Sequence, residues 1–373
     1  MRYSTRLSWL LAGVVAVAFG VTAAPVQAAA ADSGAVFVQT NSPAGNAIAS
    51  YRRGEGGSLT YVGSYATGGL GAREKGSVAD PLASQGSLVL VPDGRTLLAV
   101  NAGSDSVSVF DVEGTRLRLV QVVGSGGPFP SGLAVRGALV YVMDAGGAGY
   151  VSGFRLGGGR LHAIAGSARS LGLGNASNPF FLSSPAEVGF SPDGRHLIVT
   201  TKGNGGVDVF AVGEDGRLGA APATNPTGHV PFAFTFDAAG RLVLNYADTS
   251  SLQLFAVGAN GAITPLGPAV GDGQAAACWL VSTRGFAYAG NAGSGDISLF
   301  RVADGAVSLL NPVAASGIPG AVDMGIAEDR FLYSESEVTQ TVHAFAIGRT
   351  GALIALQVVG VPDGASMEGI AVS

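Results

Sequence analysis

The sequence has few of the residues that provide covalent or metal-based chemistry. Its 373 residues include a single cysteine, Cys278, and four histidines. One cysteine excludes an intrachain disulfide, so packing alone must hold the fold together. No GxSxG, HExxH, P-loop or GxGxxG motif is present, and no cysteine or histidine pair has the spacing of a metal site. We therefore expect neither a cofactor nor a bound metal.

Charge is also scarce in this chain. Asp, Glu, Lys and Arg make up 13% of the residues, hydrophobic residues make up 47%, and the formal net charge is −5. Lysine occurs only at Lys75 and Lys202, a bias typical of a GC-rich bacterial genome. An acidic chain is a poor partner for nucleic acid or for an anionic membrane surface. The composition therefore predicts a large buried core and no nucleic-acid partner.

The N-terminal segment predicts export. Two arginines, Arg2 and Arg6, precede an apolar run of 13 residues and a tract of small residues. The run is short for a membrane-spanning helix, which needs about 20 residues. We interpret residues 1–28 as a cleaved signal peptide and residues 29–373 as one domain without a membrane span. Cleavage would remove both arginines and change the net charge from −5 to −7. We therefore expect the protein to be secreted or held in the cell envelope.

A repeat accounts for the rest of the chain. Seven short alternating phrases, among them SVSVF, GVDVF, SLQLF and DISLF, each end in an aromatic residue. These residues are Tyr51, Phe110, Phe154, Phe210, Phe255, Phe300 and Phe345, and the last four are spaced 45 residues apart. Repeats of this length, made of strands and glycine turns, are typical of propeller blades. The sequence therefore predicts an all-β fold, a seven-bladed β-propeller with four-stranded blades.

One unit of the repeat shows how a blade is built. From Ser184 onward the phrases AEVGF, RHLIVT, GVDVF and RLGAAP read as four strands, and the turn Ser191–Gly194 joins the first two. A single four-stranded sheet must stack on neighbours to bury its apolar side chains, so seven sheets are expected in a ring. The N-terminal phrase AVFVQT matches a second strand and the C-terminal phrase GIAVS a first strand. The C-terminal strand is therefore predicted to join the N-terminal blade and close the ring.

Two connections are longer than the others. They run from Tyr65 to Ala83 and from Gly166 to Ser183, are rich in glycine, and are expected between blades. The second contains Phe180–Phe181, which predicts either an exposed apolar patch or packing of the loop onto a blade edge.

The phrases SQGSLVLVPDGRTLLAVNAGSDSVSVF and CWLVSTRGFAYAGNAGSGDISLF resemble the lactonase family of seven-bladed propellers, which includes 6-phosphogluconolactonases and carboxymuconate cyclases. The phrase LLAVNAGSDSVSVF also resembles the YVTN-type repeats of secreted and surface propellers. The resemblance covers nearly all of the chain after the predicted signal peptide. It implies the propeller fold and a site at one mouth of the ring.

The family's enzymes typically carry Arg-His at the start of an inner strand and a Glu in an Asn-Glu-Leu phrase after the next strand. The matching positions in this chain hold Ala186–Glu187 and Thr201–Lys202. In the neighbouring blade Pro130–Ser131 replaces a His-Ser phrase, whereas Asp144 retains the acid. Loss of the arginine removes a bidentate clamp for a carboxylate or phosphate. The resemblance therefore implies the fold without the family's catalytic set.

Polar residues at inner-strand starts and at the ends of second strands are expected to converge at one mouth, because both positions lie on the same rim. They are Asn101, Asp144, Glu187, Lys202, Asn291 and Asp323. Glu187 and Lys202 are the candidate catalytic residues, as base and oxyanion stabiliser; the alternative is a salt bridge that only caps the channel. Asn and Asp also form tight turns, which is the alternative for the three residues that end second strands.

Two further groups are weaker candidates. Asp323 and Glu368 could bind calcium or magnesium together with Glu187, although solvated rim acids explain the same pattern. His229 precedes the inner-strand phrase VPFAFTF and either caps its loop or reaches the mouth.

Three functions fit the sequence. The first is a monomeric exported propeller that binds a small molecule or a protein partner at its mouth. The second is a lactone hydrolase or cycloisomerase with a rearranged site, and the third is a structural protein of the cell envelope. The missing family residues favour the binding role. An exported enzyme would need a substrate other than 6-phosphogluconolactone, which arises inside cells.

Overall fold

The structure is a computed structural model that describes residues 1–3 and 34–373. The predicted signal peptide falls almost entirely outside the described residues. In the part of the chain that is described, no helix is long and apolar enough to cross a membrane. The contacts divide the chain into a unit of residues 1–30 and a compact unit of residues 31–373, and the second carries all of the strands.

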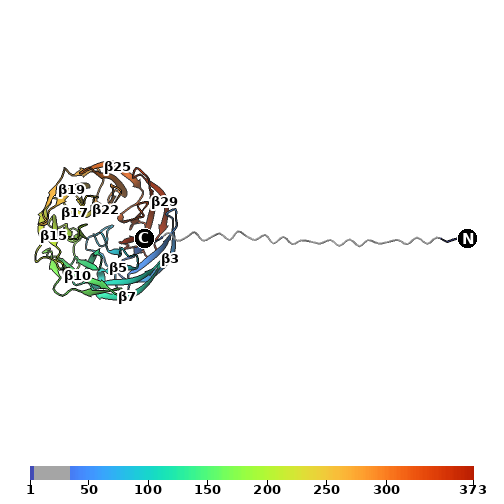
Figure 1. Cartoon of the computed structure of the whole chain (residues 1–373), viewed down its shortest axis with the longest axis horizontal. Helices are drawn as coiled ribbons and strands as arrows, with labels where there is room; N and C mark the ends of the chain where they lie inside the picture. The colour runs from blue at the N-terminus through green and yellow to red at the C-terminus, as the bar shows by residue number, and fades with distance from the viewer. Residues whose placement is uncertain (4–33) are drawn as a thin grey trace. The chain divides into compact units, whose positions relative to one another are not determined.

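Residues 34–373 form seven antiparallel sheets arranged in a ring (Figure 1). The innermost strand of each sheet lies against the innermost strands of the two neighbouring sheets at the centre of the ring. The other strands of each sheet follow outward. The predicted all-β fold is confirmed, as is the prediction of seven four-stranded blades. Within the described residues the only helical segment is one turn of 3₁₀ helix at Ala102–Ser104.

Each blade runs from an inner strand at the centre of the ring to an outer strand at its edge. From the centre outward, blade 1 is β30 (Ile370–Val372), β1 (Gly34–Gln39), β2 (Ala47–Arg53) and β3 (Leu59–Ala66). Blade 2 is β4 (Leu88–Leu90), β5 (Thr96–Asn101), β6 (Ser106–Glu113) and β7 (Arg116–Gly124). Blade 3 is β8 (Pro130–Arg136), β9 (Leu139–Asp144), β10 (Tyr150–Gly157) and β11 (Arg160–Ala163), with β12 (Arg169–Ser170) also paired to β10. Blade 4 is β13 (Pro185–Phe190), β14 (His196–Thr201), β15 (Gly206–Ala211) and β16 (Ala223–Pro226).

The last three blades follow the same order. Blade 5 is β17 (Pro231–Phe236), β18 (Leu242–Tyr246), β19 (Ser251–Val257) and β20 (Ile263–Pro265), with β21 (Val270–Gly271) also paired to β19. Blade 6 is β22 (Ala277–Thr283), β23 (Phe286–Asn291), β24 (Asp296–Ala303) and β25 (Ala306–Ser316). Blade 7 is β26 (Ala321–Ala327), β27 (Phe331–Ser336), β28 (Thr341–Ile347) and β29 (Leu353–Gly360).

The two ends of the domain close the ring. Strand β30 pairs with β1 in antiparallel register, with Phe37 opposite Ala371 and Val38 opposite Ile370. The backbone N–H of Ala35 also donates to the Ser373 hydroxyl at 2.7 Å. The predicted closure by the C-terminal strand is therefore confirmed.

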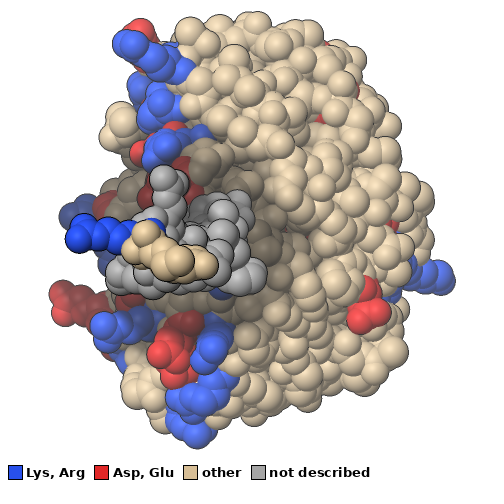
Figure 2. Space-filling view, turned by 90° about the vertical axis from the view of Figure 1, so that its right-hand side faces the viewer, with Lys and Arg blue, Asp and Glu red and all other residues tan. Residues whose placement is uncertain are grey.

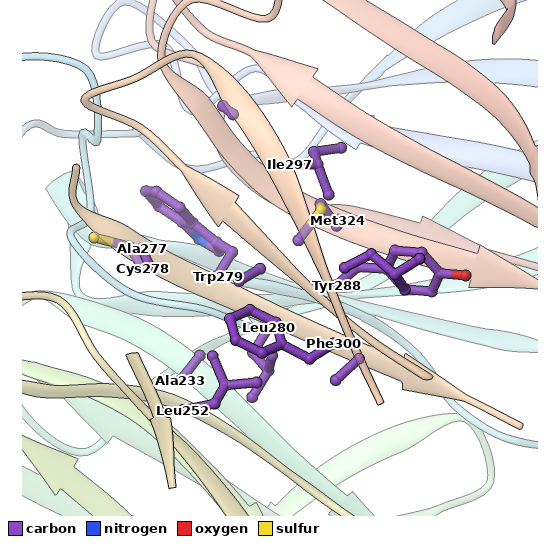
Figure 3. Packing of buried hydrophobic residues seen from close by; sticks show 14 of the residues in the cluster. Ala233, Leu252, Ala277, Cys278, Trp279, Leu280, Tyr288, Ile297, Phe300 and Met324 are labelled. Carbon is purple, nitrogen blue, oxygen red and sulfur yellow. The ribbon is translucent and has the colours of Figure 1, made fainter. Parts of the chain in front are cut away.

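The repeated aromatic residues form the packing between blades. All seven are buried, and none is more than 5% exposed. In the largest cluster Phe300 and Leu280 of blade 6 lie beside Ala233 and Leu252 of blade 5, whereas Tyr288, on the other face of the sheet, lies toward Met324 of blade 7 (Figure 3). Burial of large side chains on both faces of every sheet explains why a blade needs its neighbours.

The turn predicted at Ser191–Gly194 shows how the first two strands of a blade are joined. Asp193 Oδ1 accepts hydrogen bonds from the Ser191 hydroxyl at 2.6 Å and from the Arg195 N–H at 3.0 Å. Gly194 has φ +71°, which favours glycine. Ion pairs gather in turns of this kind, for example Arg217 with Asp215. Figure 2 shows charged side chains in one band, with the rest of the visible surface largely uncharged.

Candidate functional site

The two long connections fold onto each other. One joins β3 to β4 (67–87) and the other joins β12 to β13 (171–184). The backbone N–H of Lys75 donates to the Pro179 carbonyl at 2.9 Å, and that of Phe181 donates to the Lys75 carbonyl at 3.1 Å. The Ser184 hydroxyl donates to the Glu74 carboxylate at 2.8 Å. Each connection does link successive blades, as the sequence predicts, but the two are also bonded together across blade 2.

The end of the first connection crosses the centre of the ring. The backbone N–H of Gln85, which precedes blade 2, donates to the Ala186 carbonyl in blade 4 at 2.8 Å. Its side-chain amide bonds twice to Leu280 in blade 6: Nε2 donates to the carbonyl at 3.1 Å and Oε1 accepts from the N–H at 2.9 Å. One residue therefore ties together three blades that are not neighbours. We call residues 77–87 the plug.

A second set of bonds holds the plug to blades 1, 3 and 6. The Glu368 carboxylate, next to β30, accepts from the backbone N–H of Leu82 at 2.5 Å and of Ser84 at 3.3 Å. The Ser84 hydroxyl donates to the Ser131 carbonyl at 2.9 Å, and the Trp279 indole N–H donates to the Ser84 carbonyl at 3.3 Å. The plug is thus built into the ring and is not a loosely attached loop.

Buried and half-buried acids gather around the plug. They are Glu74, Asp80, Glu187, Asp323, Glu335 and Glu368, and burial raises the pKa of each carboxyl, that of Asp323 to about 7. Raised pKa values mean that these carboxyls hold their protons to a higher pH than exposed carboxyls do. Among the residues that the structure describes, no three His, Cys, Asp or Glu side chains are arranged to hold a metal ion.

Glu187 lies beneath the plug. The pairing of β13 with β14 shifts register at Ala186, just before Glu187. The backbone N–H of Glu187 donates to the Thr200 hydroxyl at 3.0 Å. Its Oε2 accepts from the Phe234 N–H at 2.5 Å, and its Oε1 accepts from the Gln85 amide at 3.4 Å. Both carboxyl oxygens are therefore engaged by the protein itself.

Lys202 contacts a different residue of the plug, Ala83. Its side chain is buried, and its ammonium group donates to the Ala83 carbonyl and sits 4.9 Å from the centre of the Phe232 ring. Its positive charge acts on the carboxyls of Glu74 and Asp80 and lowers the pKa of both, against the larger effect of burial. Among the described residues, the ion pair with Glu187 that the sequence suggested is not formed, because the plug engages each of the two side chains separately.

A pocket of about 530 Å³ opens beside the plug, over blades 4, 5 and 6. Its walls are mostly apolar and come from the plug, the second connection, the starts of the inner strands β17 and β22, and the residues that follow second strands. The lining residues are Ser77, Val78, Ala79, Asp80, Phe181, Leu182, Lys202, Val230, Phe232, Ala247, Asp248, Ala276, Cys278, Ala292 and Gly293. Lys202 is the one predicted site residue that the structure places on this wall.

Two other lining residues, Asp80 and Cys278, have a raised pKa. Asp80 shares a hydrogen bond with Glu368, so this pair of carboxyls retains a proton, and burial raises the pKa of both. The second oxygen of Asp80, Oδ1, is buried without a hydrogen-bond partner. Burial also raises the pKa of the Cys278 thiol, which keeps it in the unreactive thiol form.

The polar residues that end second strands are not on the pocket wall. The Asn101 amide donates to the Ser108 hydroxyl at 2.8 Å, and the Asn291 amide donates to the Ser298 hydroxyl at 2.9 Å. Asp144 is buried at the equivalent position, where it makes no bond to the equivalent Ser152 hydroxyl and burial raises its pKa to about 8. These side chains lie within and between blades, so the expected convergence at the mouth does not occur for them.

The remaining candidates lie elsewhere around the mouth. Asp323 accepts from the Met324 N–H at 2.9 Å, among the acids under the plug. His229 Nδ1 lies 3.1 Å from Asp248 Oδ2, and its ring stacks on Tyr246 at 4.7 Å, which fits the capping role suggested for it. Phe180 is 45% exposed, whereas its neighbour Phe181 faces the pocket.

The sequence reasoning missed the plug. Glu74, Asp80 and Gln85 belong to a connection with no repeat phrase, and each is positioned by partners far away in the chain. One clue was present: the stretch AREKGSVAD gathers four charged residues in a chain that has few. It also contains Lys75, one of only two lysines, and the other lysine lines the pocket.

Comparison with known proteins identifies the family. The family model described as "Lactonase, 7-bladed beta-propeller" matches residues 45–155 and 167–272. No protein of curated function matches the sequence. Among solved structures, the chain resembles a candidate 6-phosphogluconolactonase from Bacteroides uniformis, with a TM-score of 0.71, 18% identity and coverage of 90% of this chain and 99% of that one.

Two more solved structures have the same fold. A protein from Lactobacillus plantarum matches with a TM-score of 0.71 and 20% identity over 91% of this chain and 99% of that one. The periplasmic gluconolactonase of Pseudomonas aeruginosa matches with a TM-score of 0.66 and 18% identity over 91% of this chain and 98% of that one. The family match covers more than half of the sequence, and the described structure has the seven blades that the family is named for. The chain belongs to the lactonase family of seven-bladed β-propellers.

Proposed function

We propose that this protein is an exported binding propeller, which holds a small molecule in the pocket beside the plug without hydrolysing it. The observation that carries the proposal is the position of Lys202. It is a cation on the wall of a 530 Å³ pocket, whereas Glu187 is engaged below the plug. Pockets of this volume are typical of small-molecule sites.

Lys202 supplies the polar contact that such a site needs. Of its three N–H donors, one is taken by the Ala83 carbonyl, and the Phe232 face lies beside the ammonium group. A ligand carbonyl or hydroxyl that accepts a hydrogen bond from Lys202 would be held in mostly apolar surroundings, where such a bond is strong. Lys202 is therefore the residue that we expect to orient the ligand.

The pocket wall lacks the groups that hydrolysis needs. A general base must come within hydrogen-bond reach of its substrate, but Glu187 is absent from the wall and both of its oxygens are occupied. Cys278 is on the wall, but its raised pKa makes it a poor nucleophile. These features favour binding over turnover.

Export is part of the proposal. It is supported by the apolar run behind Arg2 and Arg6 at the N-terminus. The structurally similar gluconolactonase of Pseudomonas aeruginosa is described as periplasmic. Fractionation of cells that express the full chain tests this directly: the proposal requires the processed protein outside the cytoplasm.

The binding proposal is tested with purified residues 29–373 and a panel of sugar, aromatic and alkyl lactones. Thermal stabilisation and calorimetry report binding, and chromatography reports product. We expect at least one lactone to bind, Lys202→Met to abolish that binding, and Lys75→Met to leave it intact. Lys75 is the matched control because it is the other lysine, is exposed and is not on the pocket wall.

Two results would overturn the proposal. Equal binding by the wild type and Lys202→Met would show that the Lys202 ammonium group does not contact the ligand. Product formation would show an enzyme, and its loss in Glu187→Gln would identify the rearranged lactonase. In the binding protein we expect Glu187→Gln to bind like the wild type.

A further inference from the structure

The pocket differs in chemistry from a site for sugar lactones. Four of its fifteen lining residues, Ser77, Asp80, Lys202 and Asp248, have polar side chains. Asp248 is already used, since it accepts from the Val230 N–H at 3.0 Å and contacts His229. The Ser77 hydroxyl is also used, because it donates to the Asp80 carbonyl. The polar groups left for a ligand are therefore concentrated at Lys202 and Asp80.

Both groups line the pocket, and each has hydrogen-bonding capacity that the protein leaves unused. The charge of Lys202 acts directly on the Asp80 carboxyl. Asp80 Oδ1 has no hydrogen-bond partner although it is buried, and an unpaired buried oxygen is costly. A ligand head group that accepts a bond from Lys202 and meets Asp80 Oδ1 would remove that cost.

The rest of the wall is apolar and continues onto the surface. Phe181, Phe232 and Val230 line the interior. Val78 and Leu182 also line the pocket, yet their exposed fractions are 86% and 50%. Large apolar side chains at the entrance of a pocket indicate that the ligand itself brings apolar surface there.

We infer that the ligand is a neutral amphiphile, with a compact carbonyl- or hydroxyl-bearing head at Lys202 and Asp80 and an alkyl or aryl tail along Phe232, Phe181 and Leu182. This inference rests on the proposed function and specifies its ligand class. A sugar lactone is disfavoured because its ring hydroxyls would face apolar walls without partners. An alkyl tail gains about fourfold in affinity for each methylene that it buries.

The experiment measures dissociation constants by calorimetry for the mature protein with γ-butyrolactone, γ-octalactone, γ-dodecalactone and D-glucono-δ-lactone. We expect affinity to rise by about fourfold per buried methylene until the pocket is filled. D-Glucono-δ-lactone should bind more weakly than γ-octalactone. The increase per methylene is the readout that identifies an apolar wall.

A matched pair of variants locates the tail. Leu182→Ser should weaken binding of γ-dodecalactone and leave γ-butyrolactone unchanged, which flattens the dependence on chain length. Leu310→Ser is the control, because Leu310 is also 50% exposed but lies on β25, away from the pocket. It should alter no dissociation constant.

The outcomes separate this inference from the proposed function. If D-glucono-δ-lactone binds as tightly as γ-dodecalactone, or if affinity does not depend on chain length, the amphiphile inference is wrong while the binding function stands. Equal weakening by Leu182→Ser and Leu310→Ser would also overturn it. If no lactone in the wider panel binds, the proposed function itself is wrong.

Discussion

The side-chain amide of Gln85 forms two hydrogen bonds with the backbone of Leu280, which lies 195 residues further along the chain. The two bonds, of 3.1 and 2.9 Å, resemble a step of β-sheet pairing made by a side chain. They join the segment before blade 2 to the inner strand of blade 6 across the centre of the ring. The plug is therefore held from the side opposite to its own blade.

Replacement of Gln85 by Ala should loosen the plug. The change removes both bonds and leaves the buried Leu280 backbone without partners, so we expect the free energy of unfolding to fall by about 1–3 kcal/mol. Chemical denaturation measures the loss, and hydrogen exchange should show faster exchange in residues 77–87. Unchanged exchange in the plug would contradict this role.

Gln121 provides the control for that variant. Its amide makes the same two bonds to the backbone of Leu161, at 3.1 and 2.8 Å, between blades 2 and 3. Gln121→Ala should therefore reduce stability by a similar amount but leave exchange in the plug and ligand binding unchanged.

Asp144→Asn should stabilise the protein in a pH-dependent way. In the unfolded chain this carboxyl ionises near its ordinary pKa of 3.8, whereas burial raises the pKa to about 8 in the fold. Between these values the unfolded chain binds fewer protons, so the free energy of unfolding falls as pH rises. Asn loses no proton, and the advantage of the variant should grow from about pH 4 to about pH 8.

The equivalent residues of other blades explain why Asn fits at this position. Asn101 and Asn291 donate to Ser108 and Ser298, whereas the equivalent Ser152 hydroxyl next to Asp144 has no partner. Denaturation curves at several pH values check the prediction. A variant that is less stable than the wild type near pH 8 would contradict it.

The proton shared by Asp80 and Glu368 should make the plug sensitive to pH. Burial raises the pKa of both carboxyls above their ordinary values of 3.8 and 4.5, so the stability that the shared proton provides is lost as pH rises through the raised values. We expect hydrogen exchange in the plug, corrected for intrinsic rates, to speed up with rising pH. Glu368→Gln retains a donor to Asp80 and an acceptor for Leu82, and should make exchange less dependent on pH.

Deletion of Ser366–Ser373 should cause aggregation. The truncation removes β30 and exposes the edge of β1, where Val36, Phe37 and Val38 now pair with β30. It also removes Glu368, which anchors the plug. Size-exclusion chromatography and light scattering measure the effect; a monomeric, cooperatively folded product would show that closure by β30 is dispensable.

Cys278 should be inert in the folded protein. The residue is 8% exposed, and burial raises the pKa of its thiol, so almost no thiolate is present near pH 8. A chromogenic disulfide reagent should modify the residue only after denaturation in guanidinium chloride. Rapid modification of the native protein would mean that the pocket opens far enough to solvate the thiol.

The sequence by itself determined the ring. The recurrence of Phe210, Phe255, Phe300 and Phe345 at a constant interval, and the turn at Ser191–Gly194, follow from strand alternation and turn chemistry. Even the pairing of β30 with β1 could be predicted, because the first and last phrases each lack the strand that the other supplies. Local patterns of this kind are visible in a single sequence because each strand and each turn needs particular residue types at particular positions.

Only the tertiary structure decided the site. Gln85 meets Leu280, Lys202 meets the Ala83 carbonyl, and Glu368 meets Leu82, contacts that span 195, 119 and 286 residues. The plug has no repeat phrase, and its conformation depends on partners that ring closure brings to one place. The sequence therefore indicated Lys202 as a mouth residue but paired it with Glu187. The two do not pair because Ala83 binds Lys202, whereas Gln85 and Phe234 bind Glu187, through backbone and amide groups that no sequence pattern marks.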